Sequence, residues 1–466
     1  MIVGVDLGTT SLKAAAFDEA GRRLAHAARP LPTRRAPGGV AEQDPRDWLD
    51  ALWSALAEMP PGARAIGVTA QANTHVLADA QGLPLGPAIL WSDTRAAGEA
   101  ALLDARVAPE DRAAWWGGGR VDASHALARL AWWRAHAPEA YANARALLLP
   151  KDLLLRALTG EATADPLSHV GLVGPDLLIP EGALALVPGA AALLPPLRDP
   201  LALAGRHRGV PVAVGTMDAL AGVLGLGLRA AGDLAWLSGT SEVLAAAGGE
   251  PRGEPGILVF PPALGLRLHA GPTQSGGASL DWLAGATGAA PAQLAEEAAQ
   301  APRAPLFLPH LAGERAPLWE PDLRGAFLGL EAGMGRAALA RGVVEGVAYS
   351  ARLVLDSLGR STGLPGGTLL AGGGGFASDA AAQLRADALG RPLKRLATPD
   401  AGVLGAAALA AVAAGLAPSL PEALARLARH DRSFEPRDAD RHAQGFALWR
   451  DAIATLRPLS RALARR

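Results

Sequence analysis

Cysteine is absent from the 466-residue chain, and lysine occurs only three times among 44 basic residues. Without cysteine, neither disulfide bonds nor a thiolate nucleophile can contribute to the fold or the chemistry. The basic residues form no run, the formal net charge is −1 and the pI is about 6.8. Charge therefore gives no reason to expect a nucleic-acid partner or binding to an anionic membrane.

One long stretch, 401–421, has no charged residue, and its length is sufficient to span a bilayer. It is mostly alanine and glycine, and Pro418 and Pro421 close it early, so we predict a buried helix within a domain. The chain begins as a strand, without a basic region before a hydrophobic segment, so we expect no secretory signal and a cytoplasmic protein.

The length of the chain and its alternation of strands, turns and helices predict an α/β protein of more than one domain. A strand over 210–215 leads into a helix whose small residues allow close packing, and a new strand begins at Asp233. We therefore place the domain boundary near Leu228, which gives domains 1–228 and 229–466.

The first eighteen residues carry the most informative pattern. A buried strand, Ile2–Val5, is followed by a polar turn, Asp6–Lys13, and a second strand. Such a hairpin presents backbone N–H groups, threonine hydroxyls and the Lys13 ammonium, which suits a phosphate. Asp6 at the strand end could hold Mg²⁺ directly or through water. An ordinary hairpin with a polar turn explains this stretch alone equally well.

Two later glycine loops favour the phosphate interpretation. Ser238–Ser241 is again a turn between two strands that contains a Gly-Thr pair, which suggests that the two halves arose by duplication. Gly372–Asp379 connects a strand to a helix, where glycine allows close backbone approach and the helix N-terminus offers N–H donors. Gly372 and Ala377 fit a loose dinucleotide fingerprint, but the acidic residue that should follow, Asp400, lies too far along.

Other phosphate and metal motifs are absent from the sequence. It contains no Gly-x-x-x-x-Gly-Lys-Ser/Thr P-loop, no protein-kinase signature pair and no His-Glu-x-x-His zinc motif. Two Gly-Thr loops in separate halves, together with a glycine-rich turn before a helix, suit a nucleotide clamped between two domains.

With these motifs in order, the chain resembles the FGGY carbohydrate kinases of the actin/hexokinase-type ATPase superfamily, and most closely the xylulokinases. The resemblance spans nearly the whole chain and rests on Val5–Lys13, Ala88–Arg95, Leu149–Asp152, Leu237–Ser241, Phe307–Pro317 and Ala371–Gly374. It implies two ribonuclease-H-like α/β domains facing across a nucleotide- and sugar-binding cleft.

The resemblance also implies roles for individual residues. Asp6 would help to hold Mg²⁺, and Asp218 would be the catalytic aspartate that acts as base. The residues that would bind ATP are Thr9, Thr10, Lys13, Gly239, Thr240, Gly373, Gly374 and Gly402, with Gly405 beside the last. A helix cap is the alternative role for Asp218, which follows a strand and opens a helix.

The sugar-binding residues depart from the family pattern. Asn73 stands where xylulokinases have a histidine, His75 follows two positions later, and Ala219 replaces the asparagine of an Asp-Asn pair. If the stretch is extended, Asn73 and His75 lie on one face and both contact the sugar. A simple core histidine is the alternative for His75.

We therefore expect ATP-dependent phosphorylation of a ketopentose such as D-xylulose, with Mg²⁺ as cofactor. Another ketose or a polyol, such as ribulose or erythritol, is the alternative, and a non-kinase actin-like ATPase is a more distant one. Sugar and ATP are the expected partners, without nucleic acid or membrane, and a homodimer is an open possibility.

Overall fold

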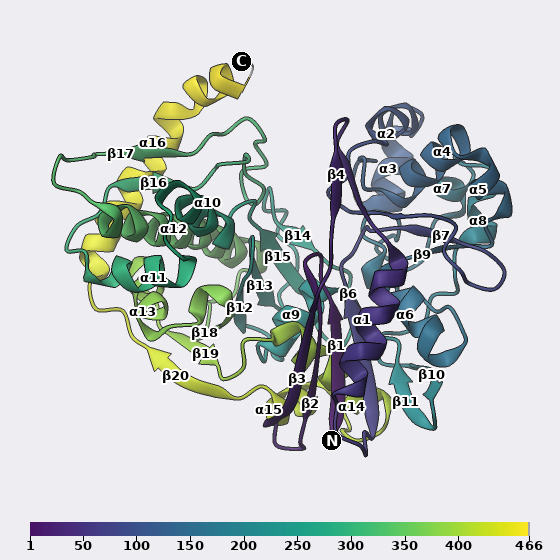
Figure 1. Cartoon of the computed structure of the whole chain (residues 1–466). Helices are drawn as coiled ribbons and strands as arrows, with labels where there is room; N and C mark the ends of the chain where they lie inside the picture. The colour runs from purple at the N-terminus through teal and green to yellow at the C-terminus, as the bar shows by residue number, and fades with distance from the viewer. Residues whose placement is uncertain (465–466) are drawn as a thin grey trace. The chain divides into compact units, whose positions relative to one another are not determined.

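The structure, a computed structural model, describes residues 1–464, and these pack as two compact units that each contain a large mixed sheet. The first unit comprises Met1–Gly225 and Gly402–Leu427. The second comprises Leu226–Ala401 and the chain from Ala428 onward (Figure 1). Each unit is described by itself below.

The sheet of the first unit has the strand order β10-β11-β6-β1-β2-β3. Strands β1, β6 and β11 are parallel, whereas β2, β3 and β10 run antiparallel to the strands beside them. The strands are β1 Ile2–Leu7, β2 Ser11–Phe17, β3 Arg23–Pro30, β6 Ala65–Ala70, β10 Leu203–His207 and β11 Val210–Ala213.

The sheet of the second unit has the order β14-β15-β13-β12-β18-β19-β20. Its strands are β12 Leu234–Ser238, β13 Glu242–Ala247, β14 Leu258–Val259, β15 Leu268–Pro272, β18 Leu369–Gly373, β19 Leu393–Leu396 and β20 His430–Phe434. From β15 to β20 the order and directions repeat those from β3 to β10: three antiparallel strands, two parallel additions and an antiparallel edge. This repeat confirms the predicted two-domain α/β fold and supports the duplication.

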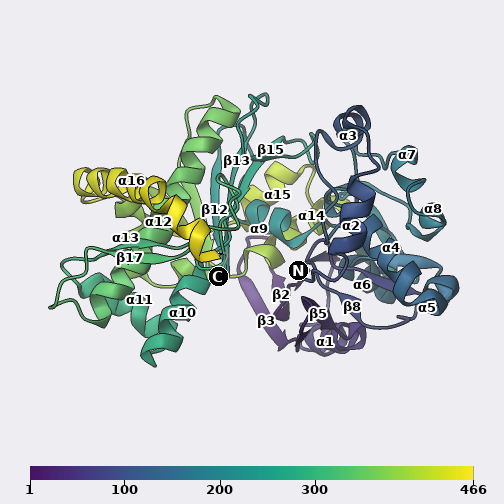
Figure 2. The same cartoon turned by 90° about the horizontal axis from the view of Figure 1, so that it is seen from above.

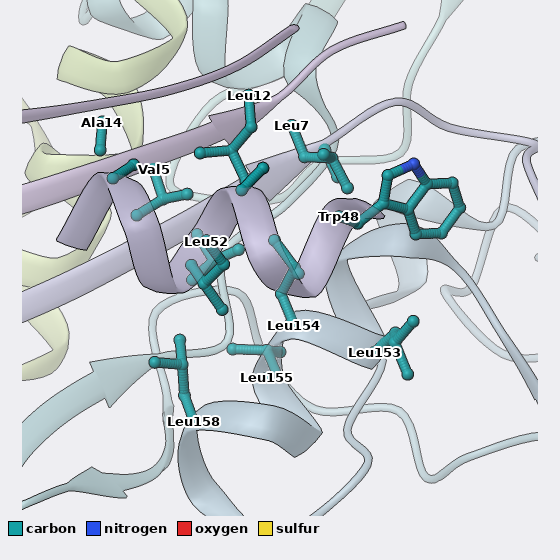
Figure 3. Packing of buried hydrophobic residues seen from close by; sticks show 14 of the residues in the cluster. Val5, Leu7, Leu12, Ala14, Trp48, Leu52, Leu153, Leu154, Leu155 and Leu158 are labelled. Carbon is teal, nitrogen blue, oxygen red and sulfur yellow. The ribbon is translucent and has the colours of Figure 1, made fainter. Parts of the chain in front are cut away.

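Helices α1 (Pro45–Ala57) and α6 (Pro150–Thr159) cover one face of the first sheet, as Figure 3 shows. Aspartate followed by proline is a typical start of a helix, and α1 begins in this way: Asp44 accepts a hydrogen bond from the N–H of Arg46 at 2.9 Å, and Pro45 is the first helical residue. Trp48 and Leu52 project from α1 into a fully buried apolar cluster with leucines of α6.

The uncharged stretch forms α14 (Ala401–Ala413), followed by α15 (Leu420–Leu427), and α14 packs against the first sheet. A Cβ on Gly4 would lie 2.0 Å from the carbonyl oxygen of Val403, and one on Gly67 would lie 1.9 Å from that of Ala406. Only glycine permits so close an approach. The predicted limits at Leu228 assign this segment to the second domain, whereas its contacts belong to the first unit.

The helices of the second unit are α10 Gly277–Thr287, α11 Pro291–Gln300, α12 Arg336–Thr362, α13 Asp379–Leu389 and α16 Ala439–Ala464. In this unit, α12, α13 and α16 pack around Trp236, Val354 and Trp449, all fully buried, whereas α10 and α11 pack with α12 in a separate cluster around Leu294 and Phe307. Within residues 1–464, no helix is long and apolar enough to cross a membrane.

A largely helical insertion in the first unit has its own core around Leu127, Leu130 and Trp133. Its helices are α2 Ala97–Asp104, α3 Pro109–Trp116, α4 Ala126–His136, α5 Pro138–Asn143, α7 Glu181–Leu184 and α8 Ala190–Leu193. The remaining short strands of the first unit are β4 Arg34–Ala36, β5 Val40–Gln43, β7 Val76–Ala78, β8 Ala88–Ile89 and β9 Ala146–Leu148, and those of the second unit are β16 Leu306–Leu308 and β17 Ala326–Leu328. Trp115, Trp116 and Trp132 pack against the core of the insertion.

We expect Gly67→Ala to lower the stability of the first unit by about 1–3 kcal/mol, because the added methyl group meets backbone that cannot move aside. Gly98→Ala in α2 is the matched control, since a Cβ there meets nothing within 4 Å and alanine favours a helix. Urea unfolding followed by circular dichroism checks this: equal midpoints for the two variants would contradict the close approach of α14.

Candidate active site

The turn between β1 and β2 follows the end of their ladder at the Leu7–Leu12 pair, and the N–H of Gly8 closes it on Ser11 O at 3.1 Å. The Thr9 hydroxyl donates to Gln71 Oε1 and accepts from Trp91 Nε1, both at 3.1 Å. Its one proton is therefore already used. Thr9 can offer a phosphate its backbone N–H, whereas the side chain of Thr10 is exposed.

Asp6, Lys13 and Thr69 occupy equivalent positions on three neighbouring strands, because Asp6 pairs with Lys13 of β2 and with Thr69 of β6. Their side chains therefore leave the same face of the sheet. The described residues contain no cluster of three or more carboxylates, histidines or cysteines that could hold a metal. That absence is compatible with Mg²⁺, which kinases commonly hold with one or two carboxylates and the phosphates of the nucleotide.

Gly402 and Gly405 open α14, and both are packed against their own unit. A Cβ on Gly402 would lie 2.3 Å from Asp6 Oδ2, and one on Gly405 would lie 1.9 Å from the carbonyl oxygen of Ala221 in α9 (Asp218–Gly225), beside α14 (Figure 2). Packing alone therefore requires glycine at both positions. The contact with Asp6 also places the first turn of α14 against the predicted Mg²⁺-binding carboxylate.

In the second unit, Gly239 and Thr240 are exposed in the turn between β12 and β13. Their carbonyl oxygens accept hydrogen bonds of 2.9 to 3.1 Å from the N–H groups of Gly276, Gly277 and Ala278 at the start of α10. The carbonyls therefore face α10, and the hydroxyl of Thr240 remains at the surface.

The glycine loop that follows β18 packs beside this turn, since Ser238 pairs with Gly373 in the parallel ladder. Gly373 has φ = +92°, and a Cβ there would lie 2.1 Å from Ser238 O, so the fold itself requires glycine. Gly374 differs: it is exposed, and a Cβ there would meet nothing within 4 Å. Its backbone is therefore the more open to a ligand.

A buried carboxyl group that the sequence did not reveal lies beneath this turn. Glu242 is fully buried and accepts hydrogen bonds from Trp236 Nε1 at 2.6 Å and Ser238 Oγ at 3.0 Å. Burial raises the pKa of Glu242 to about 7, against the opposing charge of Arg385. Its place in an apolar strand pattern gave no signal beyond one charged residue among alanines.

Asp218 is the first residue of α9, and its Oδ1 accepts a hydrogen bond from the N–H of Ala219 at 2.7 Å. The side chain keeps some exposed surface, but protein surrounds the carboxyl group densely, and this desolvation raises the pKa of Asp218 to about 6. A carboxylate that titrates near neutral pH is suited to act as a general base. The capping contact and the chemical role are thus compatible.

Asn73 and His75 lie close in sequence but not on an extended strand. Asn73 has φ = +50°, a left-handed conformation that asparagine tolerates, so the alternation argument for a shared face does not apply. Asn73 Nδ2 donates to Ser124 Oγ at 3.3 Å. His75 is 2% exposed, and within the described chain its Nδ1 has no hydrogen-bond partner.

Sequence reasoning missed a buried polar network behind Asp218. Lys151 Nζ lies 3.1 Å from Asp152 Oδ1 and 3.2 Å from Asp165 Oδ1, and all three residues are at most 1% exposed. Asp165 in turn accepts a hydrogen bond from Thr216, two residues before Asp218. The sequence placed Lys151 and Asp152 within a family motif but gave no indication of their partner.

Comparison with known proteins agrees with this architecture. Residues 1–170 match the N-terminal domain and residues 211–414 the C-terminal domain of the FGGY family of carbohydrate kinases. A xylulose kinase of Escherichia coli is 34% identical, with 95% of this chain and 96% of that protein covered. The chain belongs to the FGGY family of carbohydrate kinases. It is therefore a phosphotransferase, and kinases of this family use ATP as a substrate.

Two further relatives show the breadth of the similarity. The crystal structure of a xyloylose kinase from Brucella ovis superposes with a TM-score of 0.84 at 31% identity, with 98% of this chain and 99% of that chain covered. A glycerol kinase of Gloeobacter violaceus is 30% identical, with 97% of this chain and 96% of that protein covered. These similarities establish the family of the chain, but the relatives are named for two different substrates, xylulose and glycerol.

We expect Asp218→Asn to lower kcat by about two to four orders of magnitude, the usual contribution of a general base. The amide keeps the shape and still accepts a hydrogen bond from Ala219, so ATP binding measured by calorimetry should not change. Turnover within threefold of the unmodified enzyme, in a folded variant, would remove Asp218 from the mechanism.

The same prediction has a pH dependence. A base acts when ionised, and with a pKa of about 6 Asp218 becomes protonated as the pH falls through that value. At saturating ATP, kcat/KM for the sugar should therefore decline below about pH 6 and level off above it. If this decline, the acid limb of the profile, lay near pH 4 instead, the carboxyl group would be more hydrated than its surroundings indicate.

We expect Thr240→Val to weaken ATP binding about 10- to 100-fold, since a hydrogen bond to a charged group contributes about 1.5–3 kcal/mol. The KM for sugar should change less than threefold. Thr287→Val is the control, because the hydroxyl of Thr287 is bonded within α10 to Leu283 O at 2.8 Å. Equal loss of affinity for ATP and for sugar would instead indicate a general structural defect.

Proposed function

We propose that this kinase transfers the γ-phosphoryl group of ATP to a hydroxyl of a five-carbon ketose, with D-xylulose as the first candidate. The observation that carries the proposal is the carboxyl group of Asp218, whose pKa burial raises to about 6, at the start of a helix in a chain about one-third identical to xylulose kinases. The chemistry that this carboxylate could perform matches what those relatives are named for.

In the proposed reaction, Asp218 accepts the proton of the attacking sugar hydroxyl. The oxygen forms a bond to the γ-phosphorus as the bond between that phosphorus and the β–γ bridging oxygen breaks, and ADP leaves with the electron pair. Asp6 would hold Mg²⁺, which supplies charge neutralisation on the phosphates. Orientation of the nucleotide would come from Thr9, Thr10, Lys13, Gly239, Thr240, Gly373, Gly374 and Gly402.

The proposed sugar contacts are Asn73 and His75. Burial and the nearby charge of Arg129 keep the pKa of His75 well below its usual value, so its imidazole is neutral at physiological pH. A neutral imidazole can donate one hydrogen bond and accept another, which suits a sugar hydroxyl. Asn73 already bonds Ser124 and would present its amide from a left-handed turn.

The second candidate substrate is a polyol, and the similarity to glycerol kinases favours it. The changes at Asn73 and Ala219 affect residues with which xylulokinases are expected to contact the sugar. A site that recognises hydroxyl groups discriminates against a substrate that leaves its polar groups unpaired, so these two changes bear directly on substrate choice.

A coupled ADP-release assay over pentuloses, hexuloses, pentitols, tetritols and glycerol tests the proposal. We expect D-xylulose to have the highest kcat/KM and to yield a phosphosugar. A clear preference for a polyol would overturn the ketose assignment, and ADP release without sugar or phosphosugar would overturn the kinase mechanism.

We expect Asn73→Ala and His75→Ala each to lower kcat/KM for the sugar by about 1–3 kcal/mol, the range for a polar group left unpaired. ATP affinity without sugar should remain unchanged. Wild-type sugar kinetics in both variants would show that this stretch does not contact the substrate.

A further inference from the structure

Thr216, two residues before Asp218, is fixed through both of its polar groups. It is fully buried; its hydroxyl donates to Asp165 Oδ2 at 2.9 Å, and its carbonyl oxygen accepts from the Thr69 hydroxyl at 2.6 Å. These contacts attach the segment between β11 and α9 to two other parts of the first unit. Thr216 thus has little freedom to move.

Asp165, the acceptor of the Thr216 hydroxyl, is itself rigidly held. Oδ2 also accepts from the N–H groups of Leu167 and Ser168, both at 3.1 Å, while Oδ1 lies 3.2 Å from Lys151 Nζ. Burial acts to lower the pKa of Lys151, but the carboxylates of Asp152 and Asp165 outweigh it, so the pKa is raised and the ammonium stays charged. A buried ion pair of this kind resists movement of either partner.

The backbone on either side of Thr216 is equally constrained. Gly215 has φ = +69°, and a Cβ there would lie 2.0 Å from the carbonyl oxygen of Val68. Met217 forms a parallel bridge with Ala70, which directly follows Thr69. The carboxylate of Asp218 accepts hydrogen bonds from backbone N–H groups at the start of α9, including that of Ala219 at 2.7 Å, so the path of the backbone decides where the carboxylate lies.

We propose that Thr216 is a positioning residue for Asp218, and that the Lys151–Asp165 ion pair fixes the carboxylate of Asp218 through the Thr216 hydroxyl. This inference rests on the proposed function, in which Asp218 is the base. General-base catalysis requires the carboxylate within hydrogen-bond reach of the sugar hydroxyl, and a misplacement of about 1 Å can cost about 100-fold in rate.

The test compares Thr216→Val with Thr216→Ser. Valine keeps the shape and removes the hydroxyl, and Asp165 Oδ2 retains the N–H groups of Leu167 and Ser168 as donors. We expect Thr216→Val to lower kcat about 10- to 100-fold with the KM for ATP within twofold. Serine retains the hydroxyl and should restore kcat to within threefold of the unmodified enzyme.

A pH profile separates positioning from a structural defect. A carboxylate that moves toward solvent regains hydration, so the acid limb of kcat/KM should shift to lower pH in Thr216→Val and keep its place in Thr216→Ser. If Thr216→Val does not fold, Thr69→Val removes the other hydrogen bond of Thr216 and should show the same shift. An unchanged limb and an unchanged kcat in a folded variant overturn the inference.

The double variant Thr216→Val/Asp218→Asn distinguishes this inference from the proposed function. If Thr216 acts through Asp218, valine should lower kcat no further once the carboxylate is gone. Full additivity of the two losses would overturn the positioning role. If Asp218→Asn alone keeps wild-type turnover, the proposed function fails as well, whereas an inactive Asp218→Asn beside a fully active Thr216→Val refutes the positioning role alone.

Discussion

The architecture of the first unit depends on the direct contact between α14 and the backbone of β1 and β6. Gly4 and Gly67 leave no room for a side chain, so carbonyl oxygens of the helix lie where Cβ atoms would otherwise be. The same approach brings Gly402 against the carboxylate of Asp6 and Gly405 against α9. One packing constraint therefore relates the predicted Mg²⁺-binding residue to the helix that begins with Asp218.

The two sheets share one topology but support their first hairpins differently. In the first unit, the Thr9 hydroxyl is hydrogen-bonded to the side chains of Gln71 and Trp91, which lie outside the hairpin, so these side chains stabilise the turn. In the second unit, the turn rests on the start of α10 and on the buried carboxyl group of Glu242 beneath it. The two units therefore share a strand order but differ in the polar contacts that support each turn.

Much of the fold could be predicted from sequence because its signals are local. The cap at Asp44, the two strand–turn–strand hairpins and the glycine loop before α13 each depend on neighbouring residues, and the structure contains all of them. The packing of α14 with the first unit could not be predicted, because it depends on glycines about 340 to 400 positions earlier in the chain. Periodicity within α14 carries no information about its partner.

The candidate site divides in the same way. Residues within motifs, such as Asp6, Thr240 and Asp218, could be named from sequence, although their contacts could not. The Lys151–Asp165–Thr216 network joins positions 14 and 51 residues apart, so no local pattern marks it. For Asn73, the assumption of extended backbone was wrong, because a left-handed residue looks like any other asparagine in a sequence.

The electrostatic character of the proposed sugar contacts limits the substrates that suit them. Burial lowers the pKa of His75, and of the neighbouring His125 and His169, so these imidazoles are neutral at physiological pH. The charge of Lys151 is already balanced by Asp152 and Asp165. The guanidinium of Arg129, whose charge acts on His75, is fully buried and lies 3.2 Å from Asp93 Oδ1, so it too is paired. Recognition by neutral donors and acceptors suits uncharged hydroxyl groups. The surroundings of Asn73 and His75 thus favour a neutral sugar or polyol over a sugar acid.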